Sequence, residues 1–272
     1  MELKQLGGTG IKVPEVGIGA WRYSGGAQPL RRGIELGANL IDTAEVYGTE
    51  EAVGQAIKGM RERVFLATKV SGGHLRHDDV LRAAEDSLGR LNVDQIDLYQ
   101  IHWPNSAVPI RETMRAMEAL ADRGLIKYAG VSNFSLDDLR DAQAAMRNHP
   151  IVSNQVLYNL NRRHIEENLL AYCETNAITI IAYTPLDNGR LARRAEYPTN
   201  PEGARALAAI AAETQKTLAQ VALNWCIARP GVIVIPKSNS EARVVENCGA
   251  SGWRLSEEQV RWLDTAFAPD EE

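Results

Sequence analysis

The stretch Asn39–Lys58, NLIDTAEVYGTEEAVGQAIK, contains the unit that decides the fold of this chain. Its apolar start, Asn39–Thr43, predicts a buried strand, and the amphipathic run Glu50–Lys58 predicts a helix. Asp42 lies at the end of the strand, and Tyr47 follows in the short loop. A strand, a loop with polar side chains and a helix form the βα unit of a parallel sheet, so a chain that repeats this unit is expected to have one.

The same alternation of a short apolar segment and a longer amphipathic segment runs from end to end of the chain. The predicted strands are Val16–Trp21, Asn39–Thr43, Val64–Val70, Ile96–His102, Ile126–Val131, Ile151–Leu157, Ile178–Tyr183 and Gly231–Pro236. The predicted helices are Gln28–Leu36, Glu50–Lys58, Arg111–Arg123, Leu136–Arg147, Ile165–Thr175, Pro201–Ala228, Ser240–Asn247 and Ser256–Phe267. A further helix is predicted to run to Arg90, with Asp78 and Asp79 as candidate caps, and Ser135 is the predicted N-cap of Leu136–Arg147. The longest irregular segment, Leu191–Pro201, predicts a mobile loop.

Eight such units can form a doubly wound sheet or a closed barrel. Eight units in roughly 250 residues match the size of a (β/α)₈ barrel. Gly17 and Gly19 lack the third glycine and the helix start of the GxGxxG turn, which a doubly wound nucleotide-binding sheet would normally supply. Two extended pieces in Glu2–Pro14 predict a hairpin before the first unit. The sequence therefore predicts one α/β domain over residues 1–272, a TIM barrel with an N-terminal β-hairpin and extra C-terminal helices.

Composition excludes several classes of protein. The 272 residues are 44% hydrophobic and 24% charged, as in an ordinary globular protein. A net charge of −5 gives no general attraction to nucleic acid or to an anionic membrane. The three cysteines, Cys173, Cys226 and Cys248, are too few and too widely spaced for a disulfide framework. With no signal peptide and no apolar run of about 20 residues, we expect a cytoplasmic protein without a membrane or nucleic-acid partner.

Polar side chains stand at the carboxyl ends of most predicted strands. They are Asp42 and Thr43, Lys69, His102, Ser132 and Asn133, Gln155 within the sixth strand, Tyr183 and Thr184, and Lys237 and Ser238. In a barrel all these positions meet at one rim, where barrel enzymes keep their active sites. The combined pattern is more specific than any single member, so it predicts an active site at this rim.

Four of these residues form a set with acid–base chemistry. A tyrosine hydroxyl has a pKa near about 10, and a neighbouring Lys69 ammonium is expected to lower the pKa of Tyr47. Asp42 would hold Lys69 charged, and His102 would donate a hydrogen bond to a carbonyl oxygen. Alone, each has a plain structural explanation: an ion pair, loop packing or a rim histidine. Together they favour proton donation to an oxygen whose carbon has just received a hydride.

Six segments carry a resemblance to a known family. They are IDTAEVYG (Ile41–Gly48), ATKV (Ala67–Val70), DLYQIHWP (Asp97–Pro104), GVSNF (Gly130–Phe134), IAYTPL (Ile181–Leu186) and IPKS (Ile235–Ser238). In this order they resemble the aldo-keto reductases over nearly the whole chain. The resemblance implies a (β/α)₈ barrel that binds NADP(H) in extended form without a Rossmann domain. It also implies that Tyr47 is the general acid–base of a tetrad completed by Asp42, Lys69 and His102.

The resemblance extends to the cofactor site. It implies that Ser132, Asn133 and Gln155 bind the nicotinamide carboxamide. It also implies that Tyr183 stacks on the ring and that Thr184, which follows it, is part of the cofactor site. The pyrophosphate loop would include Pro185, Leu186, Gly189 and Leu191, and the adenosine site Lys237, Ser238, Arg243, Glu246 and Asn247. Ser240 is a candidate cap of the helix that follows, whose N-terminal amides favour an anion. The fork of Arg243 and the charge of Lys237 suit a 2′-phosphate, so we expect NADPH, with NADH as an open alternative.

The substrate pocket is expected between Trp21 and Trp103, with Tyr23 a weaker candidate. The first loop, Ser24–Pro29, is short, and Asp187 brings negative charge to the loop assigned to the pyrophosphate. Only five residues follow Phe267, so the long C-terminal substrate loop of many relatives is expected to be missing and one wall of the pocket open. We expect a monomer with broad selectivity for small carbonyl substrates, aldehydes and activated ketones.

Two other functions are alternatives to a reductase on a barrel of this kind. A metal hydrolase would need clustered ligands, but the five histidines contain no HxH pair on a strand, and His74 and His77 lack a third ligand nearby in the sequence. The sequence therefore predicts no metal site. A cofactor-sensing regulatory subunit on the same barrel is the second alternative, because a fold alone does not specify a function.

Overall fold

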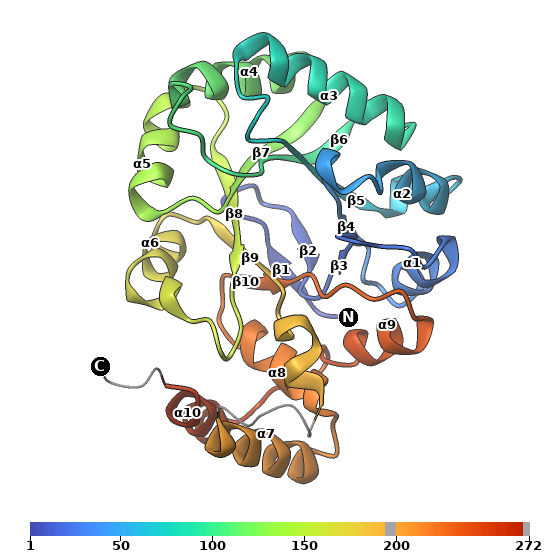
Figure 1. Ribbon diagram of the computed structural model, residues 1–272, viewed down its shortest axis with the longest axis vertical. Coiled ribbons are helices and arrows are strands. Elements are labelled where there is room, and N and C mark those ends of the chain that lie inside the picture. The colour runs from blue at the N-terminus through green and yellow to red at the C-terminus, as the bar shows by residue number, and fades with distance from the viewer. Residues whose placement is uncertain (194–199, 269–272) are drawn as a thin grey trace.

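The computed structural model describes residues 1–193 and 200–268, and its centre is a ring of eight parallel strands (Figure 1). The strands are β3 (Ile18–Gly19), β4 (Leu40–Asp42), β5 (Phe65–Val70), β6 (Ile96–Ile101), β7 (Ile126–Ser132), β8 (Ile151–Leu157), β9 (Thr179–Tyr183) and β10 (Val232–Val234). They pair in chain order from β3 to β10. A parallel bridge between Val16 and Val234 joins the first strand to the last and closes the ring. The predicted (β/α)₈ barrel is therefore confirmed.

Helices surround this ring, and α7 and α10 lie side by side at its lower edge in Figure 1. The helices are α1 (Ala27–Glu35), α2 (Glu50–Ile57), α3 (His77–Leu91), α4 (Ile110–Asp122), α5 (Leu136–Ala145), α6 (Leu169–Thr175), α7 (Pro201–Thr214), α8 (Leu218–Ile227), α9 (Glu241–Cys248) and α10 (Glu257–Ala266). Four 3₁₀ turns stand between them: η1 (Glu45–Tyr47), η2 (Arg61–Arg63), η3 (His164–Glu167) and η4 (Asp187–Ala192). Among the described helices, each is too short or too polar to cross a bilayer.

Several predicted helix boundaries are wrong, and local capping explains why. The single helix predicted over Pro201–Ala228 is two helices, because Gln215 adopts a left-handed conformation with φ 55°. Thr217 then starts α8 with a capping box that Gln220 completes. Ser135 caps α5 as predicted. Asp78 does not cap α3, which begins at His77; it lies in the first turn, where a carboxylate favours the helix dipole.

The predicted helix Ile165–Thr175 is also interrupted. It consists of the turn η3 and the short helix α6, which meet at the non-helical residue Asn168. The predicted mobile loop Leu191–Pro201 falls largely on residues 194–199, which lie outside the described part of the chain.

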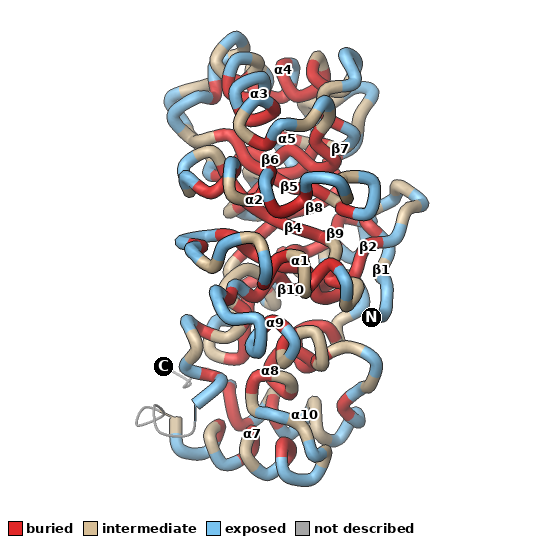
Figure 2. Tube along the Cα trace, turned by 90° about the vertical axis from the view of Figure 1, so that its right-hand side faces the viewer, coloured by how far each residue is buried: buried red, intermediate tan, exposed pale blue. Residues whose placement is uncertain are grey.

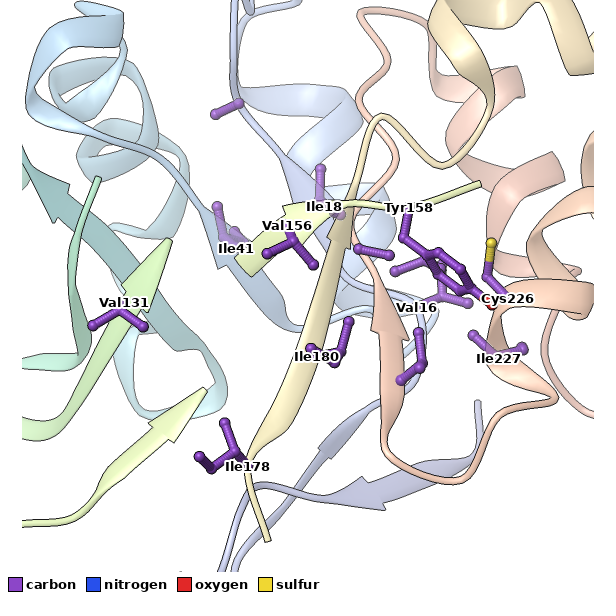
Figure 3. Close-up of a cluster of buried hydrophobic side chains, with 14 of the residues drawn as sticks. Val16, Ile18, Ile41, Val131, Val156, Tyr158, Ile178, Ile180, Cys226 and Ile227 are labelled. Carbon is purple, nitrogen blue, oxygen red and sulfur yellow. The ribbon is translucent and has the colours of Figure 1, made fainter. Parts of the chain in front are cut away.

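The hydrophobic core has two layers, because the strands are buried on both faces. One layer fills the space between strands and helices, and Figure 3 shows part of it around Tyr158 and Cys226. The other layer lies inside the barrel and contains Leu40, Leu98 and Ile181. Figure 2 shows the buried segments along the strands, with exposed segments concentrated on the outer turns.

The N-terminal hairpin closes one end of the barrel. It consists of the antiparallel strands β1 (Leu3–Gln5) and β2 (Lys12–Pro14), as the sequence predicts. Leu6 and Val13 from this hairpin pack into the inner layer of the core. Because the amino ends of the strands are covered in this way, the carboxyl ends form the open face of the barrel.

Candidate active site

A cleft of about 730 Å³ opens at the carboxyl ends of the strands. The predicted site residues that line it are Trp21, Asp42, Tyr47, His102, Trp103, Ser132, Asn133, Gln155, Tyr183, Thr184, Pro185, Leu186, Gly189, Lys237, Ser238, Arg243, Glu246 and Asn247. Lys69 lies beneath the surface of the cleft and is fully buried. Leu191 is buried in the hydrophobic core and is not among the lining residues. The barrel thus brings together residues that are far apart in the sequence.

Lys69 is the buried centre of the end of the cleft that contains Asp42, Tyr47 and His102, the candidate catalytic end. Its Nζ donates to Asp42 Oδ1 at 2.6 Å, to the carbonyl of Thr43 at 2.8 Å and to Tyr47 Oη at 3.4 Å. An ammonium has three N–H groups, so each one is directed to a separate acceptor. Burial lowers the pKa of Lys69, and the Asp42 carboxylate opposes this effect.

Tyr47 lies on η1, between Lys69 and His102. Its Oη is 3.3 Å from Nε2 of His102, and the two rings meet edge to face at 77°. Burial, followed by the charge of Asp42, raises the pKa of Tyr47, contrary to the decrease expected from the sequence. The physical reason is that removal of the hydroxyl from water disfavours its charged form, and the nearby carboxylate adds to this effect. Tyr47 is therefore a protonated donor at neutral pH.

His102 is held as a neutral imidazole. Burial and the charge of Lys69 lower its pKa to about 4. Its backbone carbonyl accepts a hydrogen bond from Asn133 Nδ2 at 3.0 Å. A neutral imidazole has one donor and one acceptor nitrogen, so His102 can orient an oxygen beside Tyr47 without adding charge.

Asp42 is fixed by more partners than the sequence indicated. Its Oδ2 accepts hydrogen bonds from Gln155 Nε2 at 2.8 Å and from Gln100 Nε2 at 3.3 Å. Gln100 was not among the predicted site residues. A sequence signal exists, because Gln100 stands two positions before His102 in one strand segment and alternate strand residues share a face. Two carboxamides and an ammonium thus hold one carboxylate.

A polar platform lies beside these residues. Tyr183 Oη donates to Asn133 Oδ1 at 2.8 Å, and Asn133 Nδ2 donates to Ser132 Oγ at 3.1 Å. Ser132 Oγ in turn donates to the backbone carbonyl of Gln155 at 2.9 Å. Asn133 adopts a left-handed conformation with φ 61°, which costs energy in most residues but is tolerated by Asn. The platform is therefore an ordered set of amide and hydroxyl groups.

The opposite end of the cleft is positively charged. Lys237 and Arg243 are exposed there, and neither forms an ion pair with any residue that the structure describes. Arg22 also lines the cleft, where its guanidinium lies 4.5 Å from the centroid of the Trp21 ring. The prediction that Ser240 caps α9 is wrong in one respect: its side chain makes no cap hydrogen bond, and its N–H donates to Ser238 Oγ at 3.1 Å.

The loop after β9 directs its acidic residue away from the cleft. Asp187 is 8% exposed, is not a lining residue and accepts a hydrogen bond from Asn161 Nδ2 at 2.9 Å. Pro185 and Gly189 line the cleft from this loop. The negative charge of Asp187 therefore does not face a ligand in the cleft.

Apolar side chains surround the mouth beside Tyr47. Trp21 is 46% exposed, Trp103 is 52% exposed, and Val46, which the sequence did not single out, is 57% exposed. Tyr23, the weaker sequence candidate, is buried, donates to the carbonyl of Gly26 at 2.7 Å and does not line the cleft. The mouth thus presents flat apolar surface to an incoming molecule.

His74 and His77 each lie against a single carboxylate. His74 Nδ1 lies 2.6 Å from Glu45, and His77 Nδ1 lies 2.8 Å from Asp78. Within residues 1–193 and 200–268, no three His, Cys, Asp or Glu side chains gather as they would around a metal ion.

Comparison with known proteins gives one consistent family. The model of the aldo/keto reductase family matches residues 15–267. Methylglyoxal reductase YeaE of Escherichia coli is 36% identical over 278 residues, which cover 98% of this chain and 96% of that protein. Glyoxal reductase of Bacillus subtilis is 34% identical over 262 residues, covering 94% and 90%.

Solved structures give the same result. The thermostable aldo-keto reductase Tm1743, in complex with the inhibitor epalrestat, has a TM-score of 0.91 and 39% identity, covering 98% of this chain and 100% of that one. An aldo/keto reductase of Klebsiella pneumoniae in complex with NADP and acetate has a TM-score of 0.89 and 36% identity, covering 100% and 98%.

Proposed function

Because this chain belongs to the aldo/keto reductase family and is an oxidoreductase, we propose that it reduces aldehydes and activated ketones to alcohols with NADPH. One observation carries the proposal. Tyr47 Oη lies at the cleft between Nζ of Lys69, at 3.4 Å, and Nε2 of His102, at 3.3 Å. This is a proton donor with a cation on one side and a neutral imidazole on the other. The α-oxoaldehydes named in two relatives are the first substrates to test.

The residues of the cleft fit a nicotinamide dinucleotide. The amide and hydroxyl groups of Ser132, Asn133 and Gln155 suit a carboxamide, and the ring of Tyr183 offers a stacking surface. At the far end, Lys237 and Arg243 supply positive charge for phosphate, and neither is in an ion pair within the described part of the chain. When bound, the cofactor supplies the hydride that reaches the carbonyl carbon.

The protein's own residues supply the proton and the charge stabilisation. Tyr47 stays protonated because burial raises its pKa, and it donates this proton as the carbonyl oxygen gains negative charge. The Lys69 ammonium then stabilises the phenolate that remains. His102 is neutral, so it orients the carbonyl oxygen without competing as an acid. Asp42 keeps Lys69 charged and aimed at Tyr47.

The shape of the mouth supports broad substrate selectivity. Trp21 and Trp103 are half exposed, so they contact a substrate through flat apolar faces rather than enclosing it. Few polar groups stand at this end to reject a poorly matched substrate, and hydrophobic contacts alone discriminate weakly. We expect aromatic aldehydes and small dicarbonyls to be reduced at similar kcat/KM.

The deciding experiment compares the parent protein with Tyr47→Phe in NADPH consumption. The panel contains methylglyoxal, glyoxal and an activated aromatic aldehyde, and cofactor fluorescence measures NADPH binding. Loss of the general acid is expected to lower kcat by about 10²-fold or more, with NADPH binding unchanged. Tyr128→Phe is the matched control, because Tyr128 stacks on Phe65 and does not line the cleft.

The alternative outcome is equally informative. If the parent binds NADPH but reduces no carbonyl compound in the panel, the reductase proposal fails. A cofactor-sensing subunit would then be the better assignment. If Tyr128→Phe loses as much activity as Tyr47→Phe, the role of Tyr47 as the proton donor is contradicted.

A further inference from the structure

Gln100 is a fully buried amide inside the barrel, directly below the catalytic end of the cleft. It lies in β6, and its Nε2 donates to Asp42 Oδ2 at 3.3 Å. It is not one of the residues that line the cleft. Gln100 therefore contacts the tetrad from within the barrel and has no access to a substrate or cofactor.

The buried amide of Gln100 lowers the stability of the folded protein relative to an apolar residue at the same position. Oε1 of Gln100 is buried and has no hydrogen-bond partner among the described residues, and the same is true of Ser153 Oγ. Both side chains crowd Gly130 on the intervening strand, where a Cβ would lie 2.5 Å from Ser153 Oγ and 3.0 Å from Gln100 Cγ. A buried acceptor without a partner destabilises the folded state, so its presence calls for another explanation than packing.

We propose that Gln100 is a positioning residue for carbonyl reduction, which holds Asp42 so that Lys69 remains aimed at Tyr47. This inference rests on the proposed function. It assigns a role in the reaction to a residue outside the cleft. The two carboxamides of Gln100 and Gln155 share one oxygen of Asp42, and this leaves the other oxygen on Lys69.

The geometry of Lys69 explains why the hydrogen bond from Gln100 to Asp42 matters for Tyr47. Two of its three N–H groups are directed to Asp42 and to the carbonyl of Thr43, and the third then points to Tyr47. If the Asp42 carboxylate rotates, the ammonium rotates with it, and the longest of the three contacts, at 3.4 Å to Tyr47, is the first to be lost. A cation that leaves Tyr47 no longer stabilises its phenolate.

Gln100 and Gln155 differ in their exposure to ligands. Gln155 lines the cleft, where a bound cofactor competes for its carboxamide. Gln100 lies beneath the cleft and does not line it, so a ligand in the cleft does not compete for its carboxamide. Gln100 is thus the donor that stays constant through the reaction.

The test replaces Gln100 by methionine, which has a similar shape and no N–H. We expect kcat for aldehyde reduction to fall about fivefold, because one hydrogen bond to a charged group is lost. KM and the Kd for NADPH are expected to stay unchanged. In the reverse reaction the rate is expected to rise at higher pH than in the parent, because the Tyr47 phenolate is less stabilised. Leu98→Met, in the same strand and the same interior, is the matched control and should change none of these values.

A second readout does not depend on activity. The melting temperatures of the parent, Gln100→Met, Asp42→Asn and the double variant form a cycle. We expect Gln100→Met to raise the melting temperature more in the Asp42→Asn background, because there the lost hydrogen bond no longer involves a carboxylate. Equal shifts in both backgrounds, or an unchanged pH profile for Gln100→Met, would overturn the inference.

The two proposals fail in different ways. If the parent reduces no carbonyl compound, the proposed function fails, and the cycle still decides whether Gln100 holds Asp42. If Gln100→Met does not fold, Gln100→Leu replaces it in both measurements. If neither variant folds while Leu98→Met does, Gln100 is a structural residue and the inference is wrong.

Discussion

The two ends of the barrel use lysines in opposite ways. At the amino end, Lys4 Nζ donates to the backbone carbonyls of Ile227, Arg229 and Val232, the latter two at 2.7 and 2.8 Å. At the carboxyl end, Lys69 donates to Asp42, to a carbonyl and weakly to Tyr47. All three N–H groups of Lys4 bind backbone carbonyls, whereas one N–H group of Lys69 is directed to Tyr47. The same residue type therefore binds backbone carbonyls at one end and lies beside the proposed proton donor at the other.

The residues around the two lysines differ in the same way as the lysines themselves. Leu6 and Val13 complete the inner core at the amino end. The carboxyl end instead contains buried charge, an amide oxygen on Gln100 with no partner among the described residues, and left-handed backbone at Asn133 and Thr184, with φ 61° and 51°. Such features destabilise a protein, and they are tolerated where they position a functional group.

Replacing each lysine by methionine separates the two roles and should give the largest effect. Lys69→Met is expected to lower turnover by about 10³-fold, because the phenolate of Tyr47 loses its cation. Lys4→Met is expected to keep turnover per folded molecule and to lose about 2 kcal/mol of unfolding free energy, because carbonyls lose their donor. Urea unfolding and kcat are measured for both. The proposed difference between the two lysines is contradicted if Lys4→Met loses turnover or if Lys69→Met retains it.

His102 gives a pH dependence that belongs to the carboxyl end alone. Its pKa in the folded protein is about 4, below the usual value of 6.5, so the unfolded chain binds the proton more tightly. Stability is therefore full above pH 6.5 and falls as the pH decreases towards 4. The loss is about 2 kcal/mol after allowance for solvent screening.

His102→Gln is expected to remove this acid-sensitive part. Unfolding free energies between about pH 4 and pH 8 measure it, and the curves of the parent and the variant should run parallel above pH 7. An unchanged acid slope in the variant would show that other groups cause the loss.

The smallest effect concerns the far end of the same cleft. Arg243→Met is expected to weaken NADPH binding about tenfold and NADH binding little, because only NADPH carries the additional phosphate. Titration of cofactor fluorescence gives both Kd values. Lys12→Met is the control, since Lys12 lies in the hairpin at the opposite end of the barrel. Equal weakening for both cofactors would remove the phosphate argument.

The fold and the location of the candidate site could both be predicted from local sequence. The alternation of strands and helices and the missing GxGxxG turn are properties of short segments, so the barrel could be predicted from them. Asp42, Lys69 and His102 could be placed together because the strands of a barrel end at one rim. The same argument missed where single segments are interrupted, as at Gln215.

The tertiary structure alone decided the contacts between strands and the ionisation of the buried groups. The sequence did not show that Gln100 reaches Asp42, that Asp187 turns away from the cleft or that Leu191 is part of the core. The sequence predicts a lowered pKa for Tyr47, but the pKa rises, because burial and then the charge of Asp42 disfavour the phenolate. Composition and periodicity act along the chain, whereas desolvation and charge pairing act through space, and only the folded arrangement determines them.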